Sequence, residues 1–455
     1  MSKKYDFNYI IIGSGPAGST AALKLAKAKK SVALIEGHFF GGSNLNTRDI
    51  PYGVALDFSH YFSQLSTYPE LQNQELSFNL PTIAARELTT VIEAGGNNKK
   101  KFEDAGIICF NGYANFLDAH TIAVNQRKLT AEFFIIATGS HLKADEISGT
   151  EVVDFLTPET AIKARRLPNV VAVIGGGSSG CEIAEYFAEL GSKVVLFEMA
   201  DHLLPKEDQE VGDLLSDYFN RRLGITVLPA SKVIALEEDE LSKRIIFRYD
   251  NTEKLVRVDT IVLATGSEPN LDLGLENAEV KYKNSGITVD KFLQTSAKNI
   301  YAAGDCLGEE SSTDRAYLEG FNLAVNLINK SKVPFDYNGI IRSINTYPEI
   351  AVVGLNENDL IRRDRKFKKV LVNLDEVIAS KIHNFDYGFT KLLIDRSGHI
   401  LGATIVAPHA SLIAQELALA IRHNLTVLEI ASTPHVINNY SQMVRLATKK
   451  LLPKH

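Results

Sequence analysis

Two glycine-rich stretches have the spacing of loops that bind a phosphate group. Residues 13–18 read GSGPAG and follow the apolar run 9–12, and residues 175–180 read GGGSSG and follow the apolar run 170–174. Glycines at these positions let the backbone approach a pyrophosphate, and the amides at the start of a following helix attract its negative charge. The spacing therefore predicts two dinucleotide-binding sites.

Each glycine-rich stretch must be held by neighbouring elements, and the sequence predicts these elements as well. Helix-forming residues follow each stretch, and then a second apolar run ends in an acid, Glu36 after residues 32–35 and Glu198 after residues 194–197. A carboxylate at this position accepts hydrogen bonds from ribose hydroxyls. Strand, helix, strand and terminal acid together predict an α/β fold with two Rossmann-like dinucleotide-binding domains.

One FAD and one nicotinamide nucleotide explain the two sites better than two copies of one ligand, because hydride transfer needs a donor ring and an acceptor ring. The carboxylate of Glu198 repels a 2′-phosphate, and residues 199–202 contain no arginine to reverse that preference. We therefore expect NADH rather than NADPH as the second nucleotide.

A third stretch, residues 41–51, resembles the redox loop of the pyridine nucleotide-disulfide oxidoreductases, a family that includes dihydrolipoamide dehydrogenase, glutathione reductase and mercuric reductase. In that family two cysteines form a disulfide against the flavin. Here Asn44 and Asp49 stand in the cysteine positions, and Gly53 replaces a lysine beside the flavin. Neither an amide nor a carboxylate can attack or leave in disulfide exchange, so we expect no disulfide relay at this loop.

The resemblance extends from about Tyr9 to Ala447 and implies roles for further residues. Asp305 would bind the ribityl chain of FAD, and the backbone amides of residues 312–313 would meet the flavin ring. The residues expected to bind FAD are Gly13, Gly15, Pro16, Ala17, Gly18, Glu36, Gly42, Ser43, Tyr113, Ala114, Thr138, Gly139, Asp305, Ser312 and Thr313. Those expected to bind the nicotinamide nucleotide are Gly175, Gly177, Ser178, Ser179, Gly180, Glu198 and Gly266.

From about Asn338, alternating strands separated by turn residues predict an antiparallel sheet. This region resembles the family's dimerisation domain, which implies a homodimer whose interface completes the partner's active site with a histidine and a glutamate. Ile437 and Gln442 stand in those positions here. His435 is a candidate substitute, although a packed or surface histidine is the favoured interpretation.

Glu182 resembles the family glutamate that pairs with the missing lysine, so we expect an unpaired carboxylate there. The candidate catalytic residues are Asn44, Asp49, Glu182, His435 and Gln442. The expected domains are an FAD-binding domain over residues 1–150 and 271–337, an NAD-binding domain over 151–270 and a dimerisation domain over 338–455. Helices are expected between about residues 56 and 103.

Composition narrows the function classes. The formal net charge of −6 and the lack of a dense Lys/Arg stripe argue against a nucleic-acid surface, and the basic end 449–455 is interpreted as a solvated tail. Cys109, Cys181 and Cys306 have no metal-ligand or redox spacing, so we expect packed thiols and no metal site. Few cysteines and no signal segment favour a cytoplasmic protein, and no apolar run is long enough for a membrane span.

These features favour an NADH-dependent, homodimeric FAD oxidoreductase that passes electrons from flavin directly to a small-molecule acceptor. One alternative is transhydrogenation between nicotinamide nucleotides, which needs a single site visited twice. A second is a flavin-binding protein without turnover, whose flavin NADH would not bleach. A third is thiol chemistry that uses the cysteines of a partner.

Overall fold

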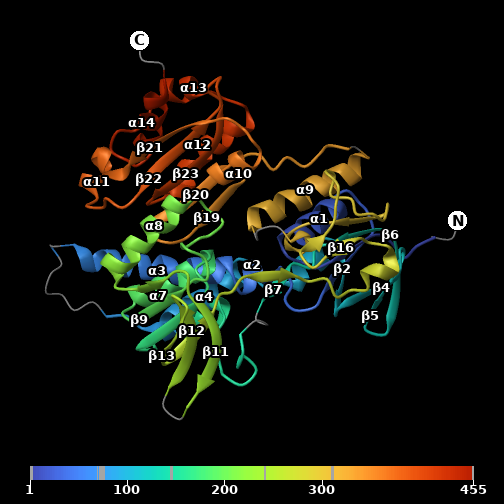
Figure 1. The fold of residues 1–455 in the computed structure, drawn as a ribbon. Coiled ribbons are helices and arrows are strands. Elements are labelled where there is room, and N and C mark those ends of the chain that lie inside the picture. The colour runs from blue at the N-terminus through green and yellow to red at the C-terminus, as the bar shows by residue number, and fades with distance from the viewer. Residues whose placement is uncertain are drawn as a thin grey trace. The chain divides into compact units, whose positions relative to one another are not determined.

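The structure is a computed structural model that describes residues 4–68, 70, 77–143, 147–239, 242–308, 312–330 and 332–452 (Figure 1). The last three residues of the expected basic tail lie outside these ranges. The chain forms two compact units. The first contains Met1–Ala55, Pro81–Lys143 and Gly266–Asp336, and the second contains Leu56–Leu80, Ala144–Thr265 and Tyr337–His455.

A parallel sheet forms the centre of the first unit. Its strands lie in the order β3, β2, β1, β6 and β18, and Ile11 of β1 is aligned with Leu34 of β2 and with Ile135 of β6. All three side chains are fully buried, as expected for a parallel sheet covered on both faces. The bounds are β1 (Phe7–Ile12), β2 (Val32–Glu36), β3 (Ile108–Asn111), β6 (Arg127–Ile136) and β18 (Ile300–Ala302), with the antiparallel β4 (Ala114–Asp118) and β5 (Thr121–Val124) beside β6.

Two helices, α1 (Pro16–Lys27) and α9 (Thr313–Asn329), pack closely against each other in this unit (Figure 1). Gly320 permits the contact, because a Cβ atom there would lie 2.2 Å from the Ala17 carbonyl oxygen. The remaining elements are α2 (Gly42–Asn46), α4 (Leu80–Glu93), α5 (Lys99–Asp104), β7 (Ser140–Leu142) paired with β15 (Ser267–Pro269), and β16 (Tyr282–Lys283) paired with β17 (Gly286–Ile287). With α3 (Asp49–Thr67), the helices α4 and α5 confirm the prediction of helices between residues 56 and 103.

The second unit contains a second parallel sheet, which also begins with strand, helix and strand. Its strand order is β10-β9-β8-β14, and the bounds are β8 (Val170–Ile174), β9 (Lys193–Phe197), β10 (Thr226–Leu228) and β14 (Thr260–Leu263), with α7 (Ser178–Glu189) between β8 and β9. A three-stranded antiparallel sheet of β11 (Lys232–Glu238), β12 (Lys243–Tyr249) and β13 (Thr252–Val258) was not anticipated. Shorter helices are α6 (Pro158–Ala161) and α8 (Gln209–Tyr218).

A five-stranded antiparallel sheet occupies the C-terminal part of this unit and confirms the prediction made from the alternating pattern. The order is β19-β20-β23-β22-β21, with β19 (Ile341–Ile344), β20 (Glu349–Gly354), β21 (Lys368–Asn373), β22 (Phe389–Ile394) and β23 (Ile400–Ala407). Its helices are α10 (Glu357–Arg362), α11 (Ile378–Ile382), α12 (Ala410–Arg422), α13 (Val427–Ser432) and α14 (Gln442–Leu451). Every residue of β22 and β23 is buried, so this sheet has its own core.

The predicted fold class is therefore confirmed. The two parallel sheets are Rossmann-like, and the C-terminal part is α+β. The proposed boundaries near residues 150, 270 and 337 stay predictions. Among the described residues, no helix has both the length and the apolar character that crossing a membrane requires.

Candidate active site

A cavity of about 830 Å³ opens in the first unit where β1, β2 and β6 end and α1 begins. Nucleotides bind at this edge of an open parallel sheet, and the volume lies in the ordinary range for small-molecule sites. The cavity is lined by all but one of the residues that the sequence assigned to FAD, namely Gly13, Gly15, Pro16, Ala17, Glu36, Gly42, Ser43, Tyr113, Ala114, Thr138, Gly139, Asp305, Ser312 and Thr313.

The exception is Gly18, which is outside the lining. A Cβ atom on Gly18 would lie 2.0 Å from the Gly13 carbonyl oxygen, so this glycine allows α1 to pack closely against β1. Gly15 differs, because a Cβ atom there would meet nothing within 4 Å. The start of α1 is therefore open toward the cavity, as a pyrophosphate would require.

Glu36 holds the loop in place and still faces the cavity. Its Oε2 accepts hydrogen bonds from the backbone N–H of Ser14, at 2.9 Å, and from the Ser14 hydroxyl, at 2.5 Å. Its Oε1 accepts from the N–H of His38 at 2.8 Å. Oε2 therefore accepts two hydrogen bonds and Oε1 only one, so Oε1 can also accept from a ribose hydroxyl. These residues fit the adenosine part of FAD.

The second glycine-rich loop repeats this geometry in the second unit. A Cβ atom on Gly180 would lie 1.8 Å from the Gly175 carbonyl oxygen, whereas one on Gly177 would meet nothing within 4 Å. Glu198 accepts hydrogen bonds from the N–H of Gly176 and from the N–H of Ala200, each at 2.7 Å. Of the other residues assigned to this nucleotide, Ser178 and Ser179 begin α7, whereas Gly266, which follows β14 in the chain, belongs to the first unit.

The two positions that are cysteines in the resembling family lie together in the cavity wall. Asn44, on α2, donates from Nδ2 to the Asp49 carboxylate at 2.8 Å and to the Thr313 hydroxyl at 3.1 Å. Asp49 begins α3, and the open space around Gly53 shows that no neighbour has moved in where a larger side chain would stand. A hydrogen-bonded amide and carboxylate therefore occupy the two positions to which the resemblance assigns a disulfide.

Two further acids border this pair. Burial raises the pKa of Asp314, and the negative charge of Asp49 adds to the effect. Asp305 accepts a hydrogen bond from the Ser140 hydroxyl at 3.3 Å, and its other oxygen lies 3.9 Å from a guanidinium nitrogen of Arg315. The wall of the cavity is polar at this end and has a negative charge at Asp49.

The expectation for Glu182 was wrong in one respect, because its carboxylate is not unpaired. Glu182 is buried on α7, and its Oε1 accepts a hydrogen bond from the backbone N–H of Asn345 at 2.7 Å. A backbone donor has taken the part expected of a lysine, so the argument for an uncompensated carboxylate fails.

The C-terminal candidates lie in the second unit. The His435 side chain is 3% exposed, and its ring nitrogens face the Thr433 carbonyl oxygen at 2.9 Å and Glu416 Oε2 at 3.2 Å. This is a packed histidine, in line with the favoured interpretation. Gln442 begins α14 with its Oε1 buried, and Ile437 is 60% exposed. A catalytic role for His435 or Gln442 stays a prediction.

The three cysteines are unpaired thiols. Cys181 and Cys306 are fully buried, and Cys109 is partly buried. Burial raises the pKa of Cys306 to about 12 and that of Cys109 to about 11, and it raises the pKa of Cys181 well above the usual range. Because the thiolate is the reactive form, all three have the character of packed side chains.

Sequence reasoning missed two residues that line the cavity, Asn270 and His38. Asn270 donates from Nδ2 to the Thr138 carbonyl oxygen at 2.7 Å, and its own carbonyl oxygen accepts from the Thr138 hydroxyl at 2.9 Å. Tyr113 meets His38 in a hydrogen bond of 2.9 Å beside Gly37. His38 follows the acid Glu36, a place where side chains near the ribose are expected, so its position was the one available signal.

Comparison with known proteins gives the class. Residues 7–320 match the family described as pyridine nucleotide-disulphide oxidoreductase, and residues 340–447 match its dimerisation domain. Together they span most of the chain, which therefore belongs to this family of NAD(P)H-dependent flavoprotein oxidoreductases, as the resemblance implied. Members of the family depend on FAD and on NAD(P).

Individual relatives and structures resemble the whole chain. A dihydrolipoyl dehydrogenase from Mycoplasma genitalium is 30% identical over 98% of this chain and 99% of its own length, and a mercuric reductase from Bacillus cereus is 28% identical over 94% and 69%. The crystal structure of LpdA from Mycobacterium tuberculosis superposes with a TM-score of 0.88 at 24% identity, covering 98% of this chain and all of that one. This structural likeness shows the fold.

Proposed function

We propose that this protein is an NADH-dependent FAD oxidoreductase that passes electrons from the flavin directly to a small acceptor, without a disulfide relay. The observation that carries the proposal is the hydrogen bond between Asn44 and Asp49, which occupies the wall of the FAD-sized cavity. Neither side chain can form or break a disulfide. Relatives are named mercuric reductase and dihydrolipoyl dehydrogenase. A mercuric ion or a dihydrolipoyl group as the substrate would require side chains other than Asn44 and Asp49 at this wall.

The residues of this chain would bind and orient the cofactor. The loop at Gly15 and the carboxylate of Glu36 would hold the pyrophosphate and the adenosine ribose, and Asp305 would hold the ribityl chain. When bound, FAD would supply the hydride acceptor and the electron donor, chemistry that no side chain provides. Glu198 would select NADH, because its carboxylate disfavours a 2′-phosphate.

The acceptor would bind at the Asn44 face of the cavity. The amide of Asn44 and the hydroxyl of Thr313 offer hydrogen bonds, and Asp49 contributes a negative charge. A polar wall of this kind favours a small acceptor with hydrogen-bonding groups over an apolar one.

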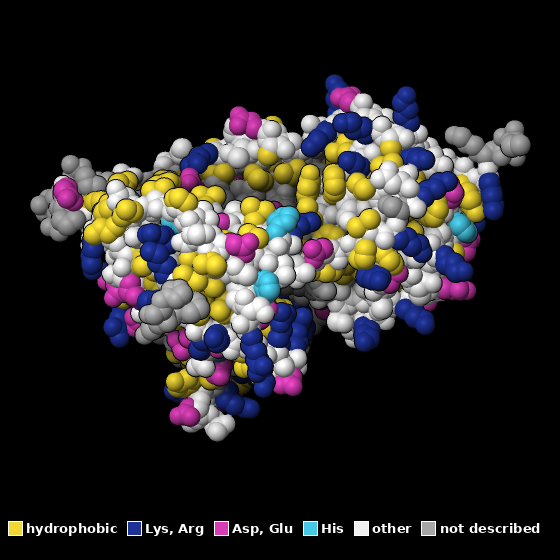
Figure 2. All heavy atoms as spheres, turned by 90° about the horizontal axis from the view of Figure 1, so that it is seen from above, with side chains coloured by type: hydrophobic (Ala, Val, Ile, Leu, Met, Phe, Trp, Pro, Cys, Tyr) yellow, Lys and Arg dark blue, Asp and Glu magenta, His cyan; other side chains and the backbone are white. Residues whose placement is uncertain are grey.

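A homodimer is part of the proposal. The dimerisation domain exposes large hydrophobic side chains. Figure 2, which colours all hydrophobic side chains yellow, shows that such side chains reach the surface on the face that it draws. Those exposed in this domain include Ile378, Ile382, Leu412, Leu419, Leu428, Val436 and Ile437. Burial of such side chains against a second copy would stabilise the dimer by ~25 cal/mol for each Å² of apolar area that is removed from water.

The test separates the two half-reactions. Asn44→Leu or Asp49→Leu should slow reoxidation of the flavin by an acceptor at least tenfold, because the polar face is lost, while flavin reduction by NADH stays within about threefold. Stopped-flow absorbance measures both rates, after an acceptor screen on the purified yellow protein. The matched control exchanges the two groups, Asn44→Asp with Asp49→Asn, which keeps the hydrogen bond and should keep most of the turnover.

Other outcomes point to other functions. A long-wavelength charge-transfer band on reduction, or inhibition by arsenite, would show that a cysteine reaches the flavin and would end the proposal. Flavin that NADH does not bleach would indicate a binding protein without turnover. If the leucine variants keep both rates and the protein reduces an oxidised NADP analogue, transhydrogenation replaces the proposed reaction.

A further inference from the structure

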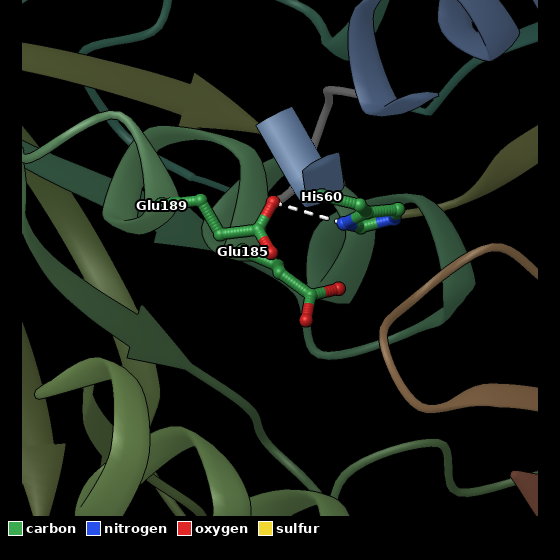
Figure 3. Close-up of side chains that lie close together, drawn as sticks. All are labelled: His60, Glu185 and Glu189. Atoms are coloured by element: carbon green, nitrogen blue, oxygen red, sulfur yellow. Dashed lines mark hydrogen bonds and ion pairs between the residues drawn. The ribbon is translucent and has the colours of Figure 1, made fainter. Parts of the chain in front are cut away.

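A second group of reactive side chains lies in the second unit and belongs to no part of the proposed flavin chemistry. Glu185 and Glu189 are four residues apart on α7 and therefore lie on one face of that helix. His60 of α3 faces them, as Figure 3 shows. One ligand-type atom from each of the three residues lies within 4.8 Å of the other two.

The three side chains of the cluster are largely shielded from solvent. The Glu185 side chain is fully buried, and the side chains of Glu189 and His60 are 2% and 15% exposed. Glu185 Oε2 accepts a hydrogen bond from the backbone N–H of Tyr347 at 2.8 Å. Its Oε1 is buried and has no hydrogen-bond partner among the described residues. A buried carboxylate oxygen without a donor is unfavourable, so a missing partner is indicated.

The imidazole of His60 is oriented for metal binding. Nε2 lies 2.9 Å from the carbonyl oxygen of Asn345, which can only accept, so Nε2 carries a hydrogen. Nδ1 then points at Glu189 Oε2, also at 2.9 Å. Metal-bound histidines commonly donate from the second nitrogen to a backbone carbonyl, which fixes the tautomer and the ring plane. Asn345 has that position here.

The charges in the cluster also favour a bound cation. With a proton on Nδ1, one imidazolium offsets only one of two neighbouring carboxylates. No second cation pairs with Glu185 among the described residues: its Oε2 accepts from the Tyr347 N–H, and its Oε1 has no hydrogen-bond partner. One divalent cation with neutral His60 would balance both carboxylates and give Glu185 Oε1 a partner.

A second acidic cluster in this unit shows carboxylates whose negative charge is already balanced by a cation. Asp208, Glu210 and Glu357 also converge, but the Lys391 ammonium already lies among them, 2.6 Å from Asp208 Oδ2, 3.2 Å from Glu210 Oε2 and 2.8 Å from Glu357 Oε1. That cluster therefore has its cation, whereas the histidine cluster has none for its second carboxylate among the described residues.

We propose that His60, Glu185 and Glu189 bind one divalent transition-metal ion, with Zn²⁺ as the matching probe, and that the ion joins α3 to α7. One nitrogen and two carboxylate ligands suit Zn²⁺, whose bonds to such ligands are ~2.0–2.2 Å. Two such bonds at a tetrahedral angle place the ligand atoms ~3.3 Å apart. The 2.9 Å between Nδ1 and Glu189 Oε2 thus needs only a small increase when the ion replaces the proton. From the sequence we expected no metal site. The three ligands gave no local signal, because they lie on two separate helices.

The experiment uses full-length, tag-free protein with its flavin, stripped with EDTA and titrated with Zn²⁺ in a calorimeter. We expect one Zn²⁺ per chain and an increase of a few degrees in the unfolding temperature, because the ion binds the folded state alone. Glu185→Gln and Glu189→Gln should each weaken binding at least ~tenfold and abolish the increase. The matched control is Glu210→Gln, which removes a carboxylate from the lysine-filled cluster and should bind within about twofold of the wild type.

X-ray absorption distinguishes this site from the thiols. The site predicts only nitrogen and oxygen neighbours, whereas cysteine binding would add sulfur at ~2.3 Å. Loss of tight binding in both glutamine variants, with circular dichroism matching the wild type, would support the proposal. The absence of one-to-one binding by the stripped wild type would overturn it. So would equal affinity in a folded Glu185→Gln or Glu189→Gln variant, or a sulfur neighbour.

Discussion

The two glycine-rich loops have the same backbone plan but are covered by different segments. In the first unit, the segment after Glu36 folds back onto Gly15, the middle glycine of the loop. The contact is close, because a Cβ atom on Gly42 would lie 2.4 Å from the Gly15 α-carbon. In the second unit, the segment after Glu198 returns one residue earlier, where the N–H of Leu204 donates to the Gly176 carbonyl oxygen at 2.8 Å. Gly177, like Gly15, has open space where a Cβ atom would stand.

This difference explains how one scaffold serves two purposes. At the first loop, the returning segment is the short helix α2, which brings Asn44 to the wall of the same cavity as Gly15. At the second loop, the returning segment contributes Leu203, which packs on Gly176. The phosphate-binding plan is therefore shared, and the chemistry depends on what is packed beside it.

The largest effect is expected where the loop packs on its own strand. Gly18→Ala and Gly180→Ala place a Cβ atom about 2 Å from a backbone oxygen, so each should lower the free energy of unfolding by ~1–3 kcal/mol or more. Gly18→Ala should yield colourless protein, whereas Gly180→Ala should keep its flavin and fail to be reduced by NADH. Absorbance spectra and thermal unfolding measure both. Loss of flavin from Gly180→Ala would show that the two loops do not act separately.

A smaller effect on stability is expected at the middle glycine of each loop, Gly15 and Gly177. Gly15 and Gly177 have φ of −61° and −73°, which any residue adopts, and neither has a neighbour where a Cβ atom would be. Alanine at either position should change the free energy of unfolding by no more than ~1 kcal/mol. The methyl group would instead meet the pyrophosphate. FAD affinity should fall in Gly15→Ala, and the KM for NADH should rise in Gly177→Ala, each by about tenfold or more.

How far the sequence could predict the molecule depended on how local each signal was. The strands, helices and acids around both loops were predicted because each depends on neighbouring residues. The β11–β13 sheet was missed although Ile245 and Phe247 alternate with more exposed residues in β12, so the signal was present. Of the residues predicted to bind FAD, only Gly18 does not line the cavity, because its close neighbour is the backbone of Gly13.

Contacts between distant segments could not be predicted. Asn270 and Thr138 are joined by two hydrogen bonds across 132 positions, and the partner of Glu182 is a backbone N–H, which no residue type reveals. The histidine cluster has the same origin, because His60 lies 129 positions before Glu189. Such pairs depend on how helices pack, and local patterns contain no information on that.

The last and smallest effect concerns nucleotide choice, where the two acids should differ although their contacts match. Glu198 and Glu36 each accept from two backbone N–H groups, so alanine would disorder either loop. Glu198→Gln keeps an acceptor and removes the charge, and Met199, which is 67% exposed, provides a place for arginine. Glu198→Gln with Met199→Arg should raise the ratio of NADPH to NADH efficiency about tenfold, since a hydrogen bond to a charged group contributes ~1.5–3 kcal/mol. Steady-state kcat/KM for both nucleotides measures this ratio.

Glu36→Gln is the control: it should weaken FAD retention and leave the ratio unchanged. A wild-type preference for NADPH would contradict the role assigned to Glu198, because a 2′-phosphate beside that carboxylate would then be tolerated.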